Sequence, residues 1–138
     1  MISLYRKIFL IFLTVLLDIG FLYIIINEQL NEYDKNYLYN LFLIHIIFIV
    51  ALIYNIKTII DVCHCFMFVA IYLGFIIENK SILIILFTLS LIQCILKEIV
   101  GECILCTDKL SLFGKAVDKY NQYCVYMILV VLLYKIMF

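Results

Sequence analysis

Long apolar runs, separated by short polar stretches, dominate the chain. About 20 helical residues cross the roughly 30 Å hydrocarbon core of a bilayer. The runs are long enough to do so, and they predict an all-α fold, a polytopic transmembrane helical bundle of about five spans, with four as the alternative. The predicted spans cover about residues 8–26, 38–56, 59–77, 82–99 and 122–138.

The segment from about 105 to 120 has a different pattern. Apolar residues recur there at three- to five-residue spacing, and charged residues fill the positions between them. This spacing predicts an amphipathic helix that lies in the membrane interface. Its apolar positions are Leu105, Leu110, Phe113, Val117 and Tyr120.

The connections between the first four runs are short. A polar stretch over 27–36 joins the first two, and Lys57 and Thr58 leave room only for a tight turn before the third. Glu78, Asn79 and Lys80 form the next turn. With no repeat and no linker-like segment, residues 1–138 are expected to form a single integral membrane domain.

Composition agrees with a membrane location. The 138 residues are 68% hydrophobic and 14% charged, with a mean hydropathy of +1.21, well above the ~45–50% apolar content of soluble domains. The formal net charge is zero, so no basic field would hold nucleic acid. The expected partners are the lipid bilayer and either other membrane-protein subunits or a second copy of the chain, but no nucleic acid.

The placement of lysine and arginine predicts the orientation, because cytoplasmic loops carry an excess of these residues. With five spans, seven basic residues fall on one side and three on the other. The side with seven is the side of the N-terminus, which predicts a cytoplasmic N-terminus and an external C-terminus. The seven are Arg6, Lys7, Lys57, Lys97, Lys109, Lys115 and Lys119, and the three are Lys35, Lys80 and Lys135.

Two ionisable residues fall deep inside predicted spans. Asp18 lies near the middle of the first span, and His45 reaches a comparable depth in the second. Ionisable groups at that depth cost at least ~2.5–3.5 kcal/mol each, so they need partners. We predict an intramembrane polar pair of Asp18 and His45. It serves either as a proton relay or ion site or, as buried charges more often do, as a packing contact.

A second group of candidates lies toward the predicted cytoplasmic side. Asp61 and His64 share a face of the third span, and Cys103 and Cys106 follow the fourth. His64, the two cysteines and either Asp61 or Cys65 could supply the four ligands of zinc. The competing interpretation is that these cysteines serve as small apolar residues and bind no metal. This is the main interpretation, so no cofactor is expected.

The same cysteine pair allows a redox interpretation. In Cys103-Ile-Leu-Cys106 one thiolate could attack a disulfide and the other resolve it, as in membrane thiol oxidoreductases. The predicted orientation places the pair on the cytoplasmic side, where reducing conditions keep thiols free. A catalytic role for Cys103 and Cys106 therefore depends on the orientation being reversed.

The spacing Ala70-x3-Gly74 in the third span allows close approach of another helix. We predict a helix-packing site there, either within the chain or between two copies. No phosphate-binding loop, H-E-x-x-H motif or G-x-S-x-G elbow occurs in the sequence, which removes the enzymes that depend on them.

The leading functional hypothesis is a non-enzymatic, multi-pass membrane protein that acts structurally or through interactions. It could belong to a viral membrane or to a larger membrane complex. The first alternative is a small transporter or ion- or proton-conducting subunit that uses Asp18, His45, Asp61 and His64. The second is a thiol oxidoreductase that uses the Cys103/Cys106 pair.

Overall fold

The computed structural model describes residues 3–100 and 112–138, and its regular structure there is entirely α-helical. The predicted all-α helical bundle is therefore confirmed. Its helices are α1 (Leu4–Asn27), α2 (Glu32–Tyr54), α3 (Lys57–Leu73), α4 (Lys80–Val100) and α5 (Leu112–Met137).

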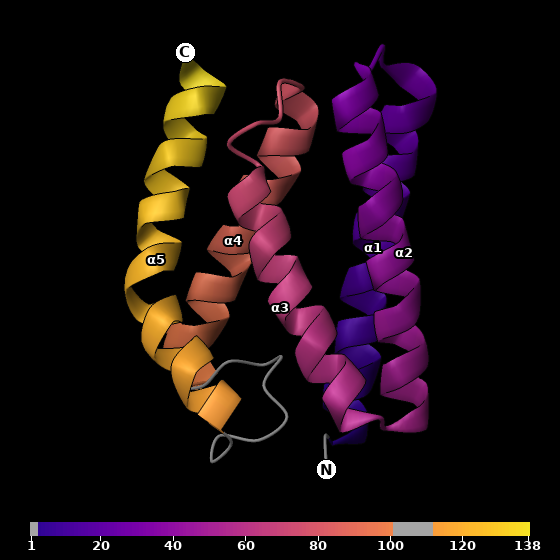
Figure 1. Cartoon of the computed structure of the whole chain (residues 1–138), viewed down its shortest axis with the longest axis vertical. Coiled ribbons are helices and arrows are strands. Elements are labelled where there is room, and N and C mark those ends of the chain that lie inside the picture. Colours follow the sequence, from indigo (N-terminus) through magenta and orange to yellow (C-terminus); the bar gives the residue numbers. More distant parts are fainter. Residues whose placement is uncertain (1–2, 101–111) are drawn as a thin grey trace.

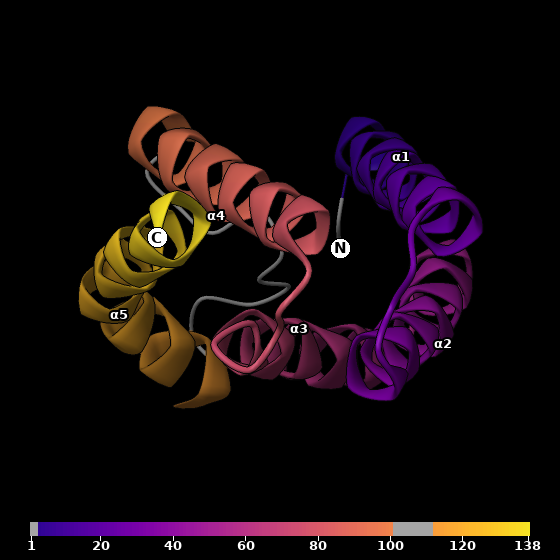
Figure 2. The same ribbon diagram turned by 90° about the horizontal axis from the view of Figure 1, so that it is seen from above.

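Successive helices run in opposite directions, so the two ends of the chain lie at opposite ends of the bundle (Figure 1). One end carries the α1–α2 and α3–α4 connections and the C-terminus, and we call it the Asn79 end. The other carries the α2–α3 turn and the start of α1, and we call it the Asn55 end. Seen along the bundle, the helices form a ring in which α4 contacts both α1 and α5, while α2 contacts α1 and α3 (Figure 2).

Asparagines set three helix boundaries. Asn31 caps α2, since its side-chain oxygen accepts the backbone N–H of Asp34 at 2.7 Å, and Asn79 accepts the N–H of Ile82 at 3.0 Å before the first turn of α4. Asn55 ends α2 in the left-handed region with φ 57°, a conformation that asparagine adopts more readily than most residues. The tight turn expected at Lys57 and Thr58 is thus made by residues 55–56, and Lys57 begins α3.

Helix α3 is shorter than the span predicted over 59–77. It ends at Leu73, and the next residues form tighter turns in which the N–H groups of Phe75, Ile76 and Ile77 each donate to the carbonyl three residues earlier. Apolar sequence continues to Ile77, so hydropathy alone does not mark the helix end. Ile77 is fully buried nonetheless, which explains why this turn is apolar.

Residues 112–120 do not form a separate element. They continue directly into the last apolar run as the single helix α5. Since proline is absent, no residue here forces a break in the helix. Residues 105–111 of the expected amphipathic segment lie outside the described residues.

Within the described residues, three helices are long and apolar enough to cross a membrane: Leu4–Asn27, Glu32–Tyr54 and Lys80–Ile99. Helix α3, with 17 residues, and the apolar part of α5, Tyr126–Met137, are shorter. An integral membrane location is thus consistent with the fold.

The apolar core has two parts. The larger lies toward the Asn79 end, where Phe21, Leu38 and Leu86 are among its buried side chains. The smaller lies toward the Asn55 end and joins α1, α2 and α3 through residues such as Leu10 and Phe48. Between the two parts, polar side chains interrupt the core, and this is where the candidate site lies.

Candidate functional site

The structure places in direct contact the two ionisable residues that the sequence predicts inside membrane spans. His45 Nδ1 and Asp18 Oδ1 are 2.6 Å apart, a short hydrogen bond between α2 and α1. The His45 side chain is 4% exposed and that of Asp18 20%. Phe21 stacks on the imidazole with 6.4 Å between ring centres. The pair is therefore enclosed by protein on the histidine side and only partly on the carboxylate side.

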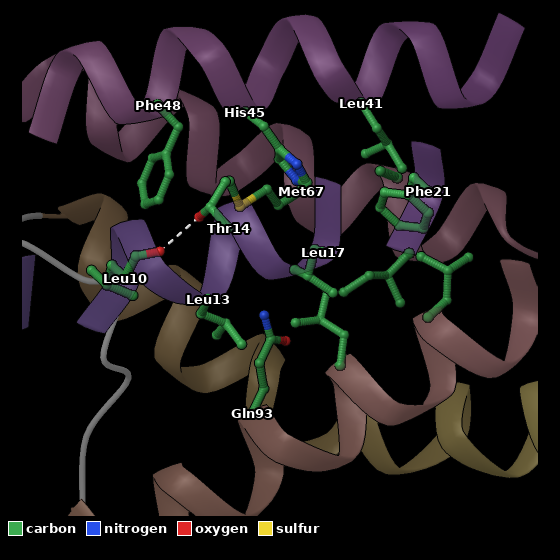
Figure 3. A pocket seen from close by; sticks show the side chains of 14 residues that line it. Leu10, Leu13, Thr14, Leu17, Phe21, Leu41, His45, Phe48, Met67 and Gln93 are labelled. Atoms are coloured by element: carbon green, nitrogen blue, oxygen red, sulfur yellow. Dashed lines mark hydrogen bonds between the residues drawn. The ribbon is translucent and has the colours of Figure 1, made fainter. Parts of the chain in front are cut away.

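The imidazole borders a cavity at the junction of the two core parts. The volume open to the centre of a water molecule there is about 40 Å³. Helices α1 to α4 all contribute to its wall, which is mainly apolar (Figure 3). The lining residues with polar side chains are Thr14, His45 and Gln93.

These three polar residues enter the cavity from different helices. His45 projects from α2 and Gln93 from α4 on the opposite side (Figure 3). The Thr14 hydroxyl donates to the Leu10 carbonyl at 2.8 Å, which leaves its oxygen able to accept. No hydrogen bond to the Gln93 amide occurs within the part of the chain that is described. Sequence reasoning found His45 from its depth but missed Gln93 and Thr14, which are uncharged and common in apolar helices.

The residues proposed as zinc ligands do not join the Asp18–His45 pair. Asp61 and His64 lie on α3, where His64 is buried and its ring tilts against Phe68 at 4.8 Å; neither lines the cavity. Cys103 and Cys106 lie outside the described residues. Among the residues that are described, no three His, Cys, Asp or Glu side chains gather in a way that could hold a metal ion.

Ala70 in α3 and Gly74, which directly follows α3, make close contacts within the chain. The Ala70 carbonyl accepts the Tyr37 hydroxyl of α2 at 2.8 Å. A Cβ added to Gly74 would stand 3.1 Å from a Leu86 methyl on α4 and 3.4 Å from a Leu132 methyl on α5. Ala70 and Gly74 thus pack α3 against its neighbours in the same chain.

A network of hydrogen bonds closes the Asn79 end of the bundle, and we call it the polar clasp. The Glu28 carboxylate accepts the Asn79 amide at 2.7 Å and the Ser81 hydroxyl at 2.6 Å. The buried Asp34 carboxylate accepts the backbone N–H groups of Asn79 at 3.0 Å and Glu78 at 3.4 Å. The clasp therefore joins the α1–α2 connection to the α3–α4 connection.

Two more contacts extend the polar clasp. The Asn31 amide donates to the Glu78 carboxylate at 3.0 Å. The Lys135 ammonium of α5 donates to the backbone carbonyls of Phe75, at 2.5 Å, and of Ile77. Lys135 thus bonds two carbonyls of the turns that follow α3.

Hydrogen bonding in the clasp has an electrostatic consequence. The donors from Asn79 and then Ser81 lower the pKa of Glu28 below its ordinary value, against a smaller opposing effect of desolvation. The clasp therefore favours the ionised carboxylate.

Comparison with known proteins identifies no relative of this chain: no family model, no curated protein and no solved structure matches it.

Proposed function

We propose that this chain is a multi-pass integral membrane protein with five membrane-crossing helices, and that it acts structurally or through interactions with other membrane helices. In this proposal it carries no catalytic site, its N-terminus is cytoplasmic and its C-terminus external. Lipid and helices of other subunits, or of a second copy, are its partners.

The observation that carries the proposal is the direction of the side chains. Asp18 and His45 bond each other within the chain, whereas every described helix presents large apolar side chains outward. Such a surface is stable only against lipid or other apolar helices. The outward residues include Phe12 on α1, Ile46 on α2, Phe66 on α3, Ile84 on α4 and Val130 on α5, each between 49% and 68% exposed.

Short connections support the same proposal. Residues 28–31, 55–56 and 74–79 join the first four helices, which leaves little chain outside the bundle to build a water-exposed active site. Of the four residues in the transporter alternative, only His45 lines the cavity, so that alternative has weaker support. The thiol-enzyme alternative rests on Cys103 and Cys106, which lie outside the described residues.

Photo-crosslinking in the native membrane tests the proposal. A benzophenone amino acid is placed singly at Phe12, Ile46, Phe66 and Val130, which face outward, and at Leu38, which is fully buried, as the control. We expect a protein-sized adduct from at least one outward face and none from Leu38. Adducts with lipid alone from every outward face would contradict an interaction role.

A further inference from the structure

The edge of His45 that faces away from Asp18 lacks a hydrogen-bond partner in the described part of the chain. Asp18 occupies Nδ1, and the His45 side chain is only 4% exposed, so little of the ring, Nε2 included, can meet bulk water. A buried polar atom without a partner is destabilising. The cavity beside the ring is where a partner would fit.

The cavity meets the conditions for holding water. A site needs about 10–15 Å³ filled by a water-sized sphere, which is about one molecule, together with two to four polar partners. About 40 Å³ is open to water centres here, and any space open to a water centre already holds at least one whole molecule, so the cavity has the room. His45, Gln93 and Thr14 provide three partners, and a cavity without them would stay dry.

The three partners also lie at one depth. Each helix has one terminal residue at the Asn79 end: Asn27 in α1, Glu32 in α2 and Lys80 in α4. Counted from that residue, Thr14, His45 and Gln93 are each thirteen positions along their helix. At 1.5 Å per residue this places all three about 20 Å from that end. Polar groups at one level inside an apolar core can converge on the same small molecules.

We propose that the cavity is a water-binding site inside the bundle, with His45 Nε2, the Gln93 amide and the Thr14 hydroxyl as its partners. The proposal is independent of whether the chain acts through interactions.

Water suits this site in either charge state of the histidine. In neutral His45 with its proton on Nδ1, Nε2 accepts a hydrogen bond, and in the charged form Nε2 donates one. Water can donate or accept, whereas the surrounding apolar side chains can do neither. Asp18 and His45 are the titratable groups at the site, because the lining residues contributed by α3 and α4 carry none. Bound water would thus connect the buried pair to exchangeable protons.

Solid-state NMR with magnetisation transfer from water, on the full chain in lipid bilayers, tests the proposal. With nitrogen-labelled histidine and glutamine, we expect rapid transfer to His45 Nε2 and to the Gln93 side chain. The methyl groups of Leu52, which is fully buried away from the cavity, serve as the dry reference. Transfer to His45 no faster than to Leu52 would overturn the proposal.

Matched substitutions test the named partners. Gln93→Leu and Thr14→Val should each reduce the transfer to His45. Thr88→Val is the control, because Thr88 is exposed on α4 and its hydroxyl bonds only its own helix, to the Ile84 carbonyl at 2.8 Å; it should leave the transfer unchanged. If Gln93→Leu does not fold, the nearly isosteric Thr14→Val still tests whether a named side chain holds the water. Undiminished transfer in the folded cavity variants would contradict these assignments.

Discussion

At the scale of single residues, the Asp18–His45 contact shows how a costly group is accommodated in an apolar bundle. Each partner supplies what the other lacks, since a carboxylate accepts and an imidazole N–H donates. The 2.6 Å separation is slightly shorter than the usual range of about 2.7–3.2 Å for N–H···O hydrogen bonds. The contact joins α1 to α2 at a depth where water cannot compete freely.

A double-mutant cycle measures this contact. Asp18→Ala, His45→Ala and the double variant should give a coupling free energy of about 1–2 kcal/mol. That lies between the ~0.6 kcal/mol average for hydrogen bonds between membrane helices and the ~1.5–3 kcal/mol for bonds to charged groups. Reversible unfolding in mixed micelles provides the measurement. A control cycle of Asp18→Ala with Ser90→Ala, whose hydroxyl bonds the Leu86 carbonyl, should show no coupling.

Glycine packing gives a second prediction at this scale. In Gly74→Ala the new methyl would lie 2.8 Å from the Ile71 carbonyl and close to Leu86, so overpacking should lower the free energy of unfolding by about 1–3 kcal/mol. In the control, Gly20→Ala, the new methyl meets only the flexible end of Ile85 at 3.3 Å. Because alanine favours helix by about 1 kcal/mol, that variant should unfold no more easily than the native chain. Equal losses in both variants would show that Gly74 packing is not tight.

At the scale of elements, the polar clasp decides how the helix pairs are joined. The α1–α2 connection bonds the α3–α4 connection through Glu28 and Asp34, and Lys135 adds α5. Asp34 and Lys135 bond backbone groups of the α3–α4 connection, whereas Glu28 bonds the Asn79 side chain; together they satisfy polar groups that lie outside the regular hydrogen bonds of the helices.

The clasp predicts a pH dependence of stability. The folded-state pKa of Glu28 lies below its ordinary value of 4.5, so its contribution is fully present above that value and is lost as pH falls through the lowered folded-state pKa. We expect the native chain to lose stability in this acidic range and Glu28→Gln to lose less. Denaturation midpoints between neutral pH and acid give the comparison. Glu32→Gln is the control, because Glu32 is exposed and makes no hydrogen bond within the described residues; an identical acid response in Glu28→Gln and the native chain would contradict the prediction.

At the scale of the whole molecule, the alternating helix directions place the two termini at opposite ends of the bundle (Figure 1). If all five helices cross the membrane, the termini lie on opposite sides of it. The excess of basic residues then favours the Asn55 end as the cytoplasmic one.

Cysteine accessibility tests this orientation. In a variant that retains only Cys103 and Cys106, a membrane-impermeant maleimide should label the protein after permeabilisation but not in intact cells. An epitope tag after Phe138 should show the opposite behaviour and be reached in intact cells. Labelling of the cysteines in intact cells would reverse the orientation and make the thiol-oxidoreductase alternative the one to examine.

The sequence by itself determined the helical class and the approximate position of each helix, because hydropathy and length act locally along the chain. It also predicted Asp18 and His45 as partners, since depth in a helix follows from residue number. The sequence predicted the ends of the helices less well. Helix α3 ends at Leu73 within an apolar run, and α5 begins before the predicted last span.

Only the tertiary structure decided the polar clasp and the cavity. Glu28 and Ser81 are 53 positions apart, and no local pattern pairs them. Gln93 acquires its importance from its position opposite His45 (Figure 3). The physical reason is the same in both cases: hydropathy sets which segments leave water, whereas hydrogen-bond partners and cavities depend on which side chains the packed helices bring together.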